Sequence, residues 1–363
     1  MNPNRALLIH YPDKYVEEEA VALAEAGGYD PAAQLTQRYL DRARYGIGEG
    51  KAEEAAAVVR EQEISTILFD GRLNASQTYN LAKLCKVEVK DREKLILEIF
   101  AKRASTAEAK LQVQLAELQY ELPRARDKVR KAKSGEQPGF FGLGKYEVDV
   151  YVRMMKKRMA TLRRKVEDVN ERRVLLMNRR IKTGYPTVAL TGYTAAGKTT
   201  LFNRLTGESK EVDAGVFTTL SPTARGIDIG GRRVLLSDTV GFISRLPPFL
   251  IEAFKSTLEE VTYAAVVLLL VDASQPLEKM ATSLQSCLRT LADLEVPETK
   301  ILTVMNKVDL VGREELRERI SNLGVKETVE ISAKTGEGLS DLLLLVKERI
   351  STSQEGGARV EAS

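Results

Sequence analysis

The sequence is poor in the residues that most often bind metals or form cross-links. Its 363 residues include two cysteines, Cys85 and Cys287, one histidine, His10, and no tryptophan. Two cysteines far apart in the chain argue against a disulfide framework and against a thiolate zinc site. Histidine chemistry would depend on His10 alone, and because His10 ends the apolar stretch ALLIH we interpret it as structural. Catalysis must instead use lysine, threonine, aspartate, backbone amides or a metal ion.

Long hydrophobic runs are also absent. The longest, AAVVLLLV at residues 264–271, is far shorter than the roughly 20 residues that span a bilayer. The first residues, MNPNRALLIHYPDKY, lack the long apolar core of a signal peptide. We therefore expect no membrane span and a cytoplasmic location, and we interpret residues 264–271 as a buried parallel strand.

Positive charge is concentrated in the middle of the chain. Residues 103–182 contain 21 Lys and Arg against 10 Asp and Glu, although the whole chain has a net charge of only +4. Residues 105–183 are predicted to form two long helices, joined by the glycine-rich SGEQPGFFGLGKYE, as an antiparallel hairpin that stands off the globular parts. The apolar stripe of the first helix is Leu111, Leu115, Leu118 and Leu122. This basic hairpin predicts a polyanionic partner, and the alternative is a merely solvated helix face.

Alternating strand and helix patterns flank the hairpin. Residues 1–104 contain the strand patterns RALLIHY, ISTILFDG and KVEVKD, each followed by a helix pattern. They predict a small α/β domain with a mostly parallel sheet. Residues 184–351 contain five buried strand patterns, which predict a doubly wound α/β domain: TVALTG, RVLLSD, AAVVLLLVD, KILTVMN and TVEIS. Residues 352–363 are small and polar and are predicted to be disordered.

A phosphate-binding loop follows the first of these five strands. Residues 189–207, ALTGYTAAGKTTLFNRLTG, match the pattern G-x-x-x-x-G-K-[ST] between a strand and a helix. The glycines let backbone N–H groups converge on phosphate oxygens, the lysine reaches the β- and γ-phosphates, and the threonine binds Mg²⁺. The predicted nucleotide contacts here are Gly192, Tyr193, Thr194, Ala195, Ala196, Gly197, Lys198, Thr199 and Thr200.

Two further segments are predicted to surround the γ-phosphate. LLSDTVGF ends a strand at Asp238, where a carboxylate can hold Mg²⁺ through water, and the N–H of Gly241 can contact the phosphate. Thr239 and Val240 lie between them. Before this motif, the segment EVDAGVFTTLSPTARG is interpreted as a switch that is ordered by the γ-phosphate. Its candidates for binding Mg²⁺ are Thr218, Thr219 and Thr223.

Two motifs near the carboxyl ends of later strands predict guanine specificity. ILTVMNKVDL places Asn306, Lys307 and Asp309 after a buried strand. A carboxylate at Asp309 can accept from N1–H and the 2-amino group of guanine, and adenine offers neither donor, so the carboxylate would be left unpaired. EISAKTGEG adds, after the last strand, a segment whose backbone N–H can meet guanine O6: Ser332, Ala333 and Lys334. The four motifs in order predict a GTP site.

The sequence resembles the HflX family of ribosome-associated GTPases over nearly its whole length. The resemblance rests on YGIGEGK, ILFDGRLNASQTYNL and DREKLILEIFAKRASTAEAKLQVQLAELQYELPR in the first domain. In the second it rests on GYTAAGKTTLFNRLTG, FTTLSPT, DTVGFI, LPPFLIEAFKSTLEEV and VDAS. It implies a Ras-like P-loop GTPase domain, GTP as substrate, GDP as product and Mg²⁺ as cofactor. It also implies binding to the large ribosomal subunit and rRNA. Position within FTTLSPT assigns the switch threonine to Thr219, next to Phe217 and Thr218.

The resemblance completes the expected site. The catalytic residues are then Lys198, Thr219 and Gly241, and the Mg²⁺ ligands are Thr199, Thr219 and Asp238. Family members commonly have asparagine at the position of Ala195, where it can help to bind an activating monovalent cation, so potassium activation is not expected here. The segment SGEQPGFFGLGKYE is shorter than usual for the family.

Phe242 stands where Ras-like proteins carry a water-orienting glutamine. A phenyl ring cannot orient water, so we expect Phe242 to pack and intrinsic hydrolysis to be slow until the ribosome stimulates it. These features predict a GTP-driven switch that acts in ribosome dissociation or rescue and is a monomer in solution. One alternative is a GTPase that acts on a protein partner without RNA. Another is a second nucleotide site at YGIGEGK (45–51), although a turn explains these glycines equally well.

Overall fold

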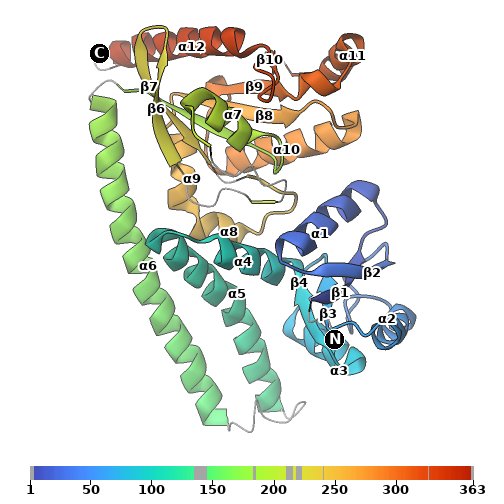
Figure 1. Ribbon diagram of the computed structural model, residues 1–363. Coiled ribbons are helices and arrows are strands. Elements are labelled where there is room, and N and C mark those ends of the chain that lie inside the picture. Colours follow the sequence, from blue (N-terminus) through green and yellow to red (C-terminus); the bar gives the residue numbers. More distant parts are fainter. Residues whose placement is uncertain are drawn as a thin grey trace. The chain divides into compact units, whose positions relative to one another are not determined.

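The computed structural model describes residues 4–134, 145–182, 185–209, 216–217, 223–239, 241–325 and 327–360. The chain divides into two compact units, Met1–Glu167 and Asp168–Ser363, and the division falls within helix α6 (Lys145–Lys182). Figure 1 shows the elements of each unit.

A four-stranded parallel sheet forms the centre of the first unit, with the strand order β2-β1-β3-β4. Its elements are β1 (Arg5–His10), α1 (Lys14–Ala26), β2 (Asp30–Thr36), α2 (Glu49–Glu61), β3 (Thr66–Phe69), α3 (Ala75–Cys85), β4 (Glu88–Asp91), α4 (Arg92–Arg103) and α5 (Ala107–Ser134). One face of the sheet packs on α2 and α3, where Ile9, Ile67 and Phe69 are buried. Helices α1 and α4, which contact each other, contribute Leu23 and Ile96 to the rest of the core. The predicted α/β fold of this region is confirmed.

Side chains fix the beginnings of the helices that follow three of these strands. Asp13 accepts from the N–H groups of Tyr15 and Val16 at the start of α1. Asn74 and Gln77 form a capping box at the start of α3. Asp91 accepts from the N–H of Lys94 in α4. A side-chain acceptor at the N-cap is typically worth about 1 kcal/mol because it satisfies an amide that lacks a partner within the helix.

Two elements of this unit are missing from the strand and helix patterns of the sequence. Strand β2 is at an edge and half-exposed, so its residues DPAAQLT carry no continuous apolar run. Helix α2 buries mainly small residues, Ala52, Ala55 and Ala56. The glycines of YGIGEGK form the turn that leads into α2: Gly46 has φ +80° and Gly48 is the N-cap.

His10 is a structural residue, as predicted. It is 1% exposed, its Nδ1 donates to the carbonyl of Tyr11 at 2.8 Å, and its Nε2 lies 3.0 Å from Oε1 of Gln34. These contacts hold the end of β1 beside β2.

Helices α5 and α6 lie side by side and share an apolar seam (Figure 1). The predicted stripe is on this seam, where Leu115, Leu118 and Leu122 pack with Met155 and Leu162 and Leu111 is partly buried. The loop SGEQPGFFGLGKYE falls largely outside the described residues.

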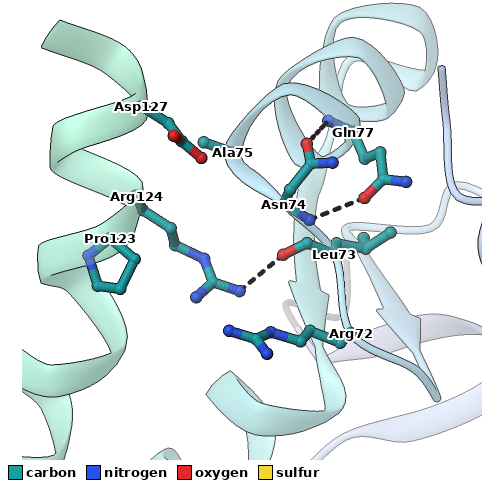
Figure 2. Close-up of a pocket in the computed structure, with 8 residues that line it drawn as sticks. All are labelled: Arg72, Leu73, Asn74, Ala75, Gln77, Pro123, Arg124 and Asp127. Carbon is teal, nitrogen blue, oxygen red and sulfur yellow. Dashed lines mark hydrogen bonds between the residues drawn. The ribbon is translucent and has the colours of Figure 1, made fainter. Parts of the chain in front are cut away.

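The expectation that the hairpin stands off the globular parts is wrong for α5. This helix contacts α3 and α4. Arg124 of α5 donates to the carbonyl of Leu73 at 2.8 Å and pairs with the buried carboxylate of Asp91, which also accepts from Tyr120 at 2.9 Å. Figure 2 shows Arg124 and Leu73 at the wall of a cavity of about 250 Å³ between the start of α3 and α5. A buried aspartate at the end of β4 therefore ties the hairpin to the sheet.

The second unit contains a six-stranded sheet with the order β10-β9-β8-β5-β7-β6, parallel except for β6. Its elements are β5 (Thr187–Gly192), α7 (Lys198–Thr206), β6 (Thr223–Ile229), β7 (Arg232–Asp238), α8 (Pro248–Ala253), α9 (Lys255–Thr262), β8 (Val266–Asp272), α10 (Leu277–Asp293), β9 (Ile301–Asn306), α11 (Arg313–Leu323), β10 (Thr328–Ile331) and α12 (Leu339–Val360), with short 3₁₀ turns η2 (Glu298–Lys300) and η3 (Val308–Leu310). Helices α7 and α12 cover one face, and α9, α10 and α11 cover the other. The predicted doubly wound α/β domain is confirmed.

Two features of this unit differ from the sequence expectations. TARGIDI, which begins in the expected switch, forms the antiparallel edge strand β6 and alternates too weakly to be recognised. Residues 352–360, predicted to be disordered, continue α12. The buried Leu342, Val346 and Ile350 anchor this helix, and adding turns to a formed helix costs little. None of the helices in the described parts of the chain is both long and apolar enough to cross a membrane.

Candidate nucleotide-binding site

The loop between β5 and α7 can be built only with glycine at two positions. Gly192 has φ +141°, and a Cβ there would lie 2.4 Å from the carbonyl oxygen of Leu270 in β8. Gly197 has φ +94°, and a Cβ there would lie 2.2 Å from Nδ2 of Asn306. Between them Ala195 also has a positive φ, +59°, while Ala196 is buried. The loop therefore folds tightly over the ends of β5 and β8 and delivers the chain into α7.

Gly197 is the N-cap of α7, and glycine offers no side chain to accept from the first amides of the helix. Lys198, Thr199 and Thr200 form the first turn. The positive end of the helix dipole and these amides together favour an anion at this end.

Lys198 lies within the loop. Its side chain is buried and its Nζ donates to the carbonyls of Gly192 at 3.1 Å and Tyr193 at 2.8 Å. Burial lowers the pKa of Lys198 to about 8, and the carboxylate of Asp238 opposes this shift. Gly241 is close by, since a Cβ there would lie 3.0 Å from the same Nζ. The expected catalytic lysine is thus placed between the loop and the segment that follows β7.

Thr199 and Asp238 provide an oxygen pair suited to a hard cation. Thr199 Oγ1 donates to Asp238 Oδ2 at 3.3 Å, and both residues are buried. Hydroxyl and carboxylate oxygens are ligands that Mg²⁺ accepts alongside water and phosphate, so these residues fit the predicted metal. A magnesium ion held here would neutralise negative charge on the phosphates.

The segment after β7 is joined to the phosphate-binding loop by backbone hydrogen bonds. The N–H of Thr194 donates to the carbonyl of Phe242 at 2.7 Å, and the N–H of Phe242 donates to Gly192 at 3.0 Å. Thr239 Oγ1 donates to the carbonyl of Leu190 at 2.7 Å. Phe242 is 1% exposed, so its expected packing role is confirmed. These contacts place Gly241 beside the loop.

Three of the predicted nucleotide contacts lie outside the described residues: Thr218 and Thr219 of the switch, and Val240 of the segment after β7. Phe217 is described, and its buried backbone N–H lies 3.4 Å from Thr194 Oγ1. Thr223, the third threonine candidate, begins β6 and pairs in register with Asp238 of β7.

A cavity of about 340 Å³ lies beside the loop where a base would bind. It is lined by Gly197, Thr200, Asn306, Lys307, Asp309, Leu310, Ser332, Ala333 and Lys334. Every predicted base-contacting residue is therefore gathered around one cavity. Asp309 is exposed at its wall, in the turn η3.

Asn306 supports this cavity from beneath. Its Nδ2 donates to the carbonyl of Ala196 at 2.8 Å, and its Oδ1 accepts from the N–H of Ala333 at 2.9 Å. Lys307 donates to Asp272 at 2.6 Å at the end of β8. Sequence reasoning missed Asp272 and Leu310: the signals were the VDAS that ends β8 and the leucine that ends NKVDL.

The fold and the gathered motifs define a P-loop GTPase domain of the Ras-like class. Three family models match consecutive parts of the chain: "GTP-binding GTPase N-terminal" at residues 14–101, "GTP-binding GTPase Middle Region" at 103–180 and "50S ribosome-binding GTPase" at 187–307. GTPase HflX of Methanocaldococcus jannaschii is 44% identical over 94% of this chain and 84% of its own. GTPase HflX of Escherichia coli is 36% identical over 96% and 83%. The chain belongs to the HflX family of GTP-hydrolysing enzymes.

A solved structure resembles the whole chain. It is that of a GTP-binding protein from the hyperthermophilic archaeon Sulfolobus solfataricus in complex with GDP, with a TM-score of 0.51 and 27% identity over 96% of this chain and 99% of that chain. The likeness extends over both units.

Proposed function

We propose that this GTPase is a switch that associates with the large ribosomal subunit through its N-terminal unit and that GTP controls this association. The description of the family model that matches residues 187–307 names a 50S ribosome-binding GTPase. The observation on this chain that carries the proposal is a dense cationic face on α6. Ribosome dissociation or rescue is the proposed outcome of the association.

The proposed nucleotide contacts follow the geometry of the second unit. Lys198 turns from the carbonyls of the loop to the β- and γ-phosphates, and the amides of the first turn of α7 surround the phosphate oxygens. Thr199 and Asp238, together with Thr219, hold Mg²⁺. Asp309 accepts from the guanine ring while the N–H of Lys334 meets O6, since the N–H groups of Ser332 and Ala333 donate to Glu337 and Asn306. The GDP complex of the Sulfolobus protein supports the nucleotide class.

Slow intrinsic hydrolysis belongs to the proposal. Phe242 is buried, and it stands in the sequence where Ras-like proteins carry the glutamine that orients the attacking water. Catalytic groups supplied by a partner raise the rate of such GTPases by about 10³- to 10⁵-fold. In this proposal the ribosome acts as that partner.

The cationic face of α6 lies opposite the seam with α5. Met155 and Leu162 are buried in the seam, and seven exposed cations lie among residues 149–166. They are Arg153, Lys156, Lys157, Arg158, Arg163, Arg164 and Lys165. Arg153, Lys157 and Arg164 follow a spacing of four and seven residues, which places them on one line along the helix. A row of cations of this kind neutralises the phosphates of an RNA backbone, and such binding weakens steeply with salt.

The test is GTP hydrolysis by the full chain with and without purified large ribosomal subunits, in potassium and in sodium salts. We expect strong stimulation by the subunits, with equal rates in the two salts because Ala195 provides no side-chain oxygen for a monovalent cation. A variant with Lys157→Glu and Arg164→Glu should lose stimulation and co-sedimentation. Arg317→Glu, an exposed cation of α11, is the matched control. A protein that neither binds the subunits nor responds to them would contradict the proposal and favour a protein partner.

A further inference from the structure

A second surface of the N-terminal unit combines exposed aromatic rings with arginines. It is the loop between β2 and α2, residues 37–48 (Figure 1). Tyr39 is 50% exposed, which is high for a ring of its size. The guanidinium carbons of Arg38 and Arg42 lie 5.6 Å and 5.4 Å from the centre of that ring. A tyrosine left half in solvent between two arginines is not explained by the core of the unit.

The neighbourhood of this ring repeats the same chemistry. Arg44, whose side chain is 62% exposed, lies over the ring of Tyr45 at 5.0 Å, although Tyr45 itself is buried in the core. On α3, Tyr79 is 45% exposed and Lys83 lies over its ring at 6.0 Å. The side chain of Asn80, next to Tyr79, donates to the carbonyl of Arg44 at 3.0 Å, which brings the helix and the loop together. Planar groups and positive charges are thus gathered over α3 and the loop.

The loop that carries Tyr39 is held firmly. Leu40 is buried, and Arg42 and Gly46 exchange two backbone hydrogen bonds of 3.1 and 2.8 Å. Gln77 of α3 donates to the carbonyl of Arg42 at 2.9 Å. The ring and the arginines are consequently presented by a fixed backbone, so little freedom is lost when a ligand covers them.

The arginines near Tyr39 are not closely stacked on its ring. Where an arginine and a tyrosine stack closely in this unit, Arg124 over Tyr120, the guanidinium lies 3.4 Å from the ring centre. At Tyr39 the distances are about 2 Å longer, and the residue as a whole is half-exposed. Rings and guanidinium planes of this kind stack on unpaired nucleobases, and the positive charge meets the flanking phosphates.

We propose that residues 38–44, with Tyr79 and Lys83 of α3, form a stacking platform for unpaired nucleotides of RNA. The inference rests on the proposed function for its RNA partner and deepens it by naming a second contact. This contact recognises single-stranded segments, whereas α6 binds the phosphates of any RNA. Asp41 and the Arg44–Glu49 ion pair of 2.9 Å limit the local positive charge. Stacking, more than charge, therefore supplies the affinity at this surface.

The test measures binding of the full-length protein to a single-stranded oligouridylate and to an RNA duplex of equal length by fluorescence anisotropy. Tyr39→Ala should weaken single-strand binding by about 5- to 150-fold, the range for loss of one stacked base, and leave duplex binding unchanged. Tyr39→Phe, which keeps the ring, should bind like the parent protein. Tyr263→Ala removes an exposed tyrosine of the second unit and is the matched control, since Tyr263 is 41% exposed.

A cross-linking experiment locates the contact without relying on a variant. The same oligonucleotide carrying 4-thiouridine should, on irradiation, attach to the tryptic peptide that contains Tyr39. Equal loss of single-strand and duplex binding in Tyr39→Ala, or unchanged binding with cross-links only to α6, would overturn the platform. Either result would leave the ribosomal proposal intact, because that proposal is decided separately by stimulation of GTP hydrolysis.

Discussion

Strands β1 and β5 occupy equivalent places in their two sheets, but the helices that follow them have different N-caps. Each has parallel neighbours on both sides and lies where the strand order of its sheet reverses. This position is where α/β proteins commonly bind ligands. After β1, the carboxylate of Asp13 caps α1 by accepting from two amides. After β5, Gly197 caps α7 without a side chain.

This difference explains why the same strand-to-helix arrangement favours phosphate binding after β5 and disfavours it after β1. A carboxylate at the N-cap uses the amides and repels a phosphate, and the capping residues Asn74 and Asp91 likewise fill the starts of α3 and α4. Glycine at the same place leaves the amides and the dipole for a ligand. At YGIGEGK the N-cap is also a glycine, Gly48, without a side-chain acceptor, and there Glu49 in the first turn of α2 supplies the negative charge that disfavours a phosphate.

The largest predicted effect comes from giving α7 the kind of cap that α1 has. Gly197→Asp places a carboxylate where phosphates would lie and a Cβ only 2.2 Å from Asn306 Nδ2. We expect GDP affinity, measured by calorimetry, to fall at least about 10³-fold, equivalent to about 4 kcal/mol. The control is Gly207→Ala, which meets a similar positive φ of +72° with nothing within 4 Å of its Cβ. If the control lost as much affinity, backbone strain rather than the cap would be responsible.

Base recognition should respond next most strongly. Asp309→Asn replaces the carboxylate at the wall of the cavity by an amide that cannot accept from both guanine donors. We expect GTP to bind about 10²-fold more weakly, with the preference over ATP reduced by the same factor. Competition binding with the two nucleotides measures this. An unchanged preference would show that Ala333 and its neighbours select the base.

Removing a cap from the N-terminal unit should affect stability alone. Asn74→Ala breaks the capping box with Gln77, in which both partners bond at 2.8 to 2.9 Å. We expect the free energy of unfolding to fall by about 1 kcal/mol in chemical denaturation. GDP affinity should stay as in the parent protein. A matching loss of affinity would mean that the start of α3 affects the nucleotide site.

The smallest effect concerns Glu93, at the start of α4. Burial raises the pKa of Glu93, as does the nearby Asp91, and Arg72 and Arg124 oppose the shift. The ionised form is therefore disfavoured in the folded state, and stability present at acid pH is lost as pH rises through the pKa of Glu93 in the folded protein. Glu93→Gln should raise the free energy of unfolding at neutral pH by less than about 1 kcal/mol, since the ion pair it removes, Arg72–Glu93 at 3.6 Å, is exposed on the arginine side. Denaturation at about pH 4 should show no difference.

The buried parts of both sheets could be predicted from the sequence, and the edges could not. Strands such as β8 are apolar on both faces and stand out. The missed strands β2 and β6 are terminal in their sheets, so at least one side of each faces solvent and the apolar pattern fades. Helix α2 was missed because it is buried through alanines, which carry little hydrophobic signal.

The candidate site was predictable where phosphate binding requires particular residues at fixed spacings in the sequence. Phosphate binding requires Gly192, Gly197 and Lys198 at set intervals, and the structure places them together. The position of Lys198 on the carbonyls of its own loop was not predictable, because it follows from burial of the ammonium group. The ion pair between Arg124 and Asp91 was not predictable either. Asp91 ends a strand pattern and Arg124 lies in a helix pattern, and neither pattern indicates a partner in the other segment.

The two hydrogen bonds of Asn306 have a consequence for the kinetics of nucleotide capture. They connect Ala196 of the phosphate loop with Ala333 of the base loop across 137 positions of chain. If only a fraction of the molecules has an assembled site, the apparent affinity for the nucleotide is reduced by that fraction. Because Asn306 joins the two halves through hydrogen bonds of the protein itself, it raises that competent fraction, and an arriving nucleotide more often meets an assembled site.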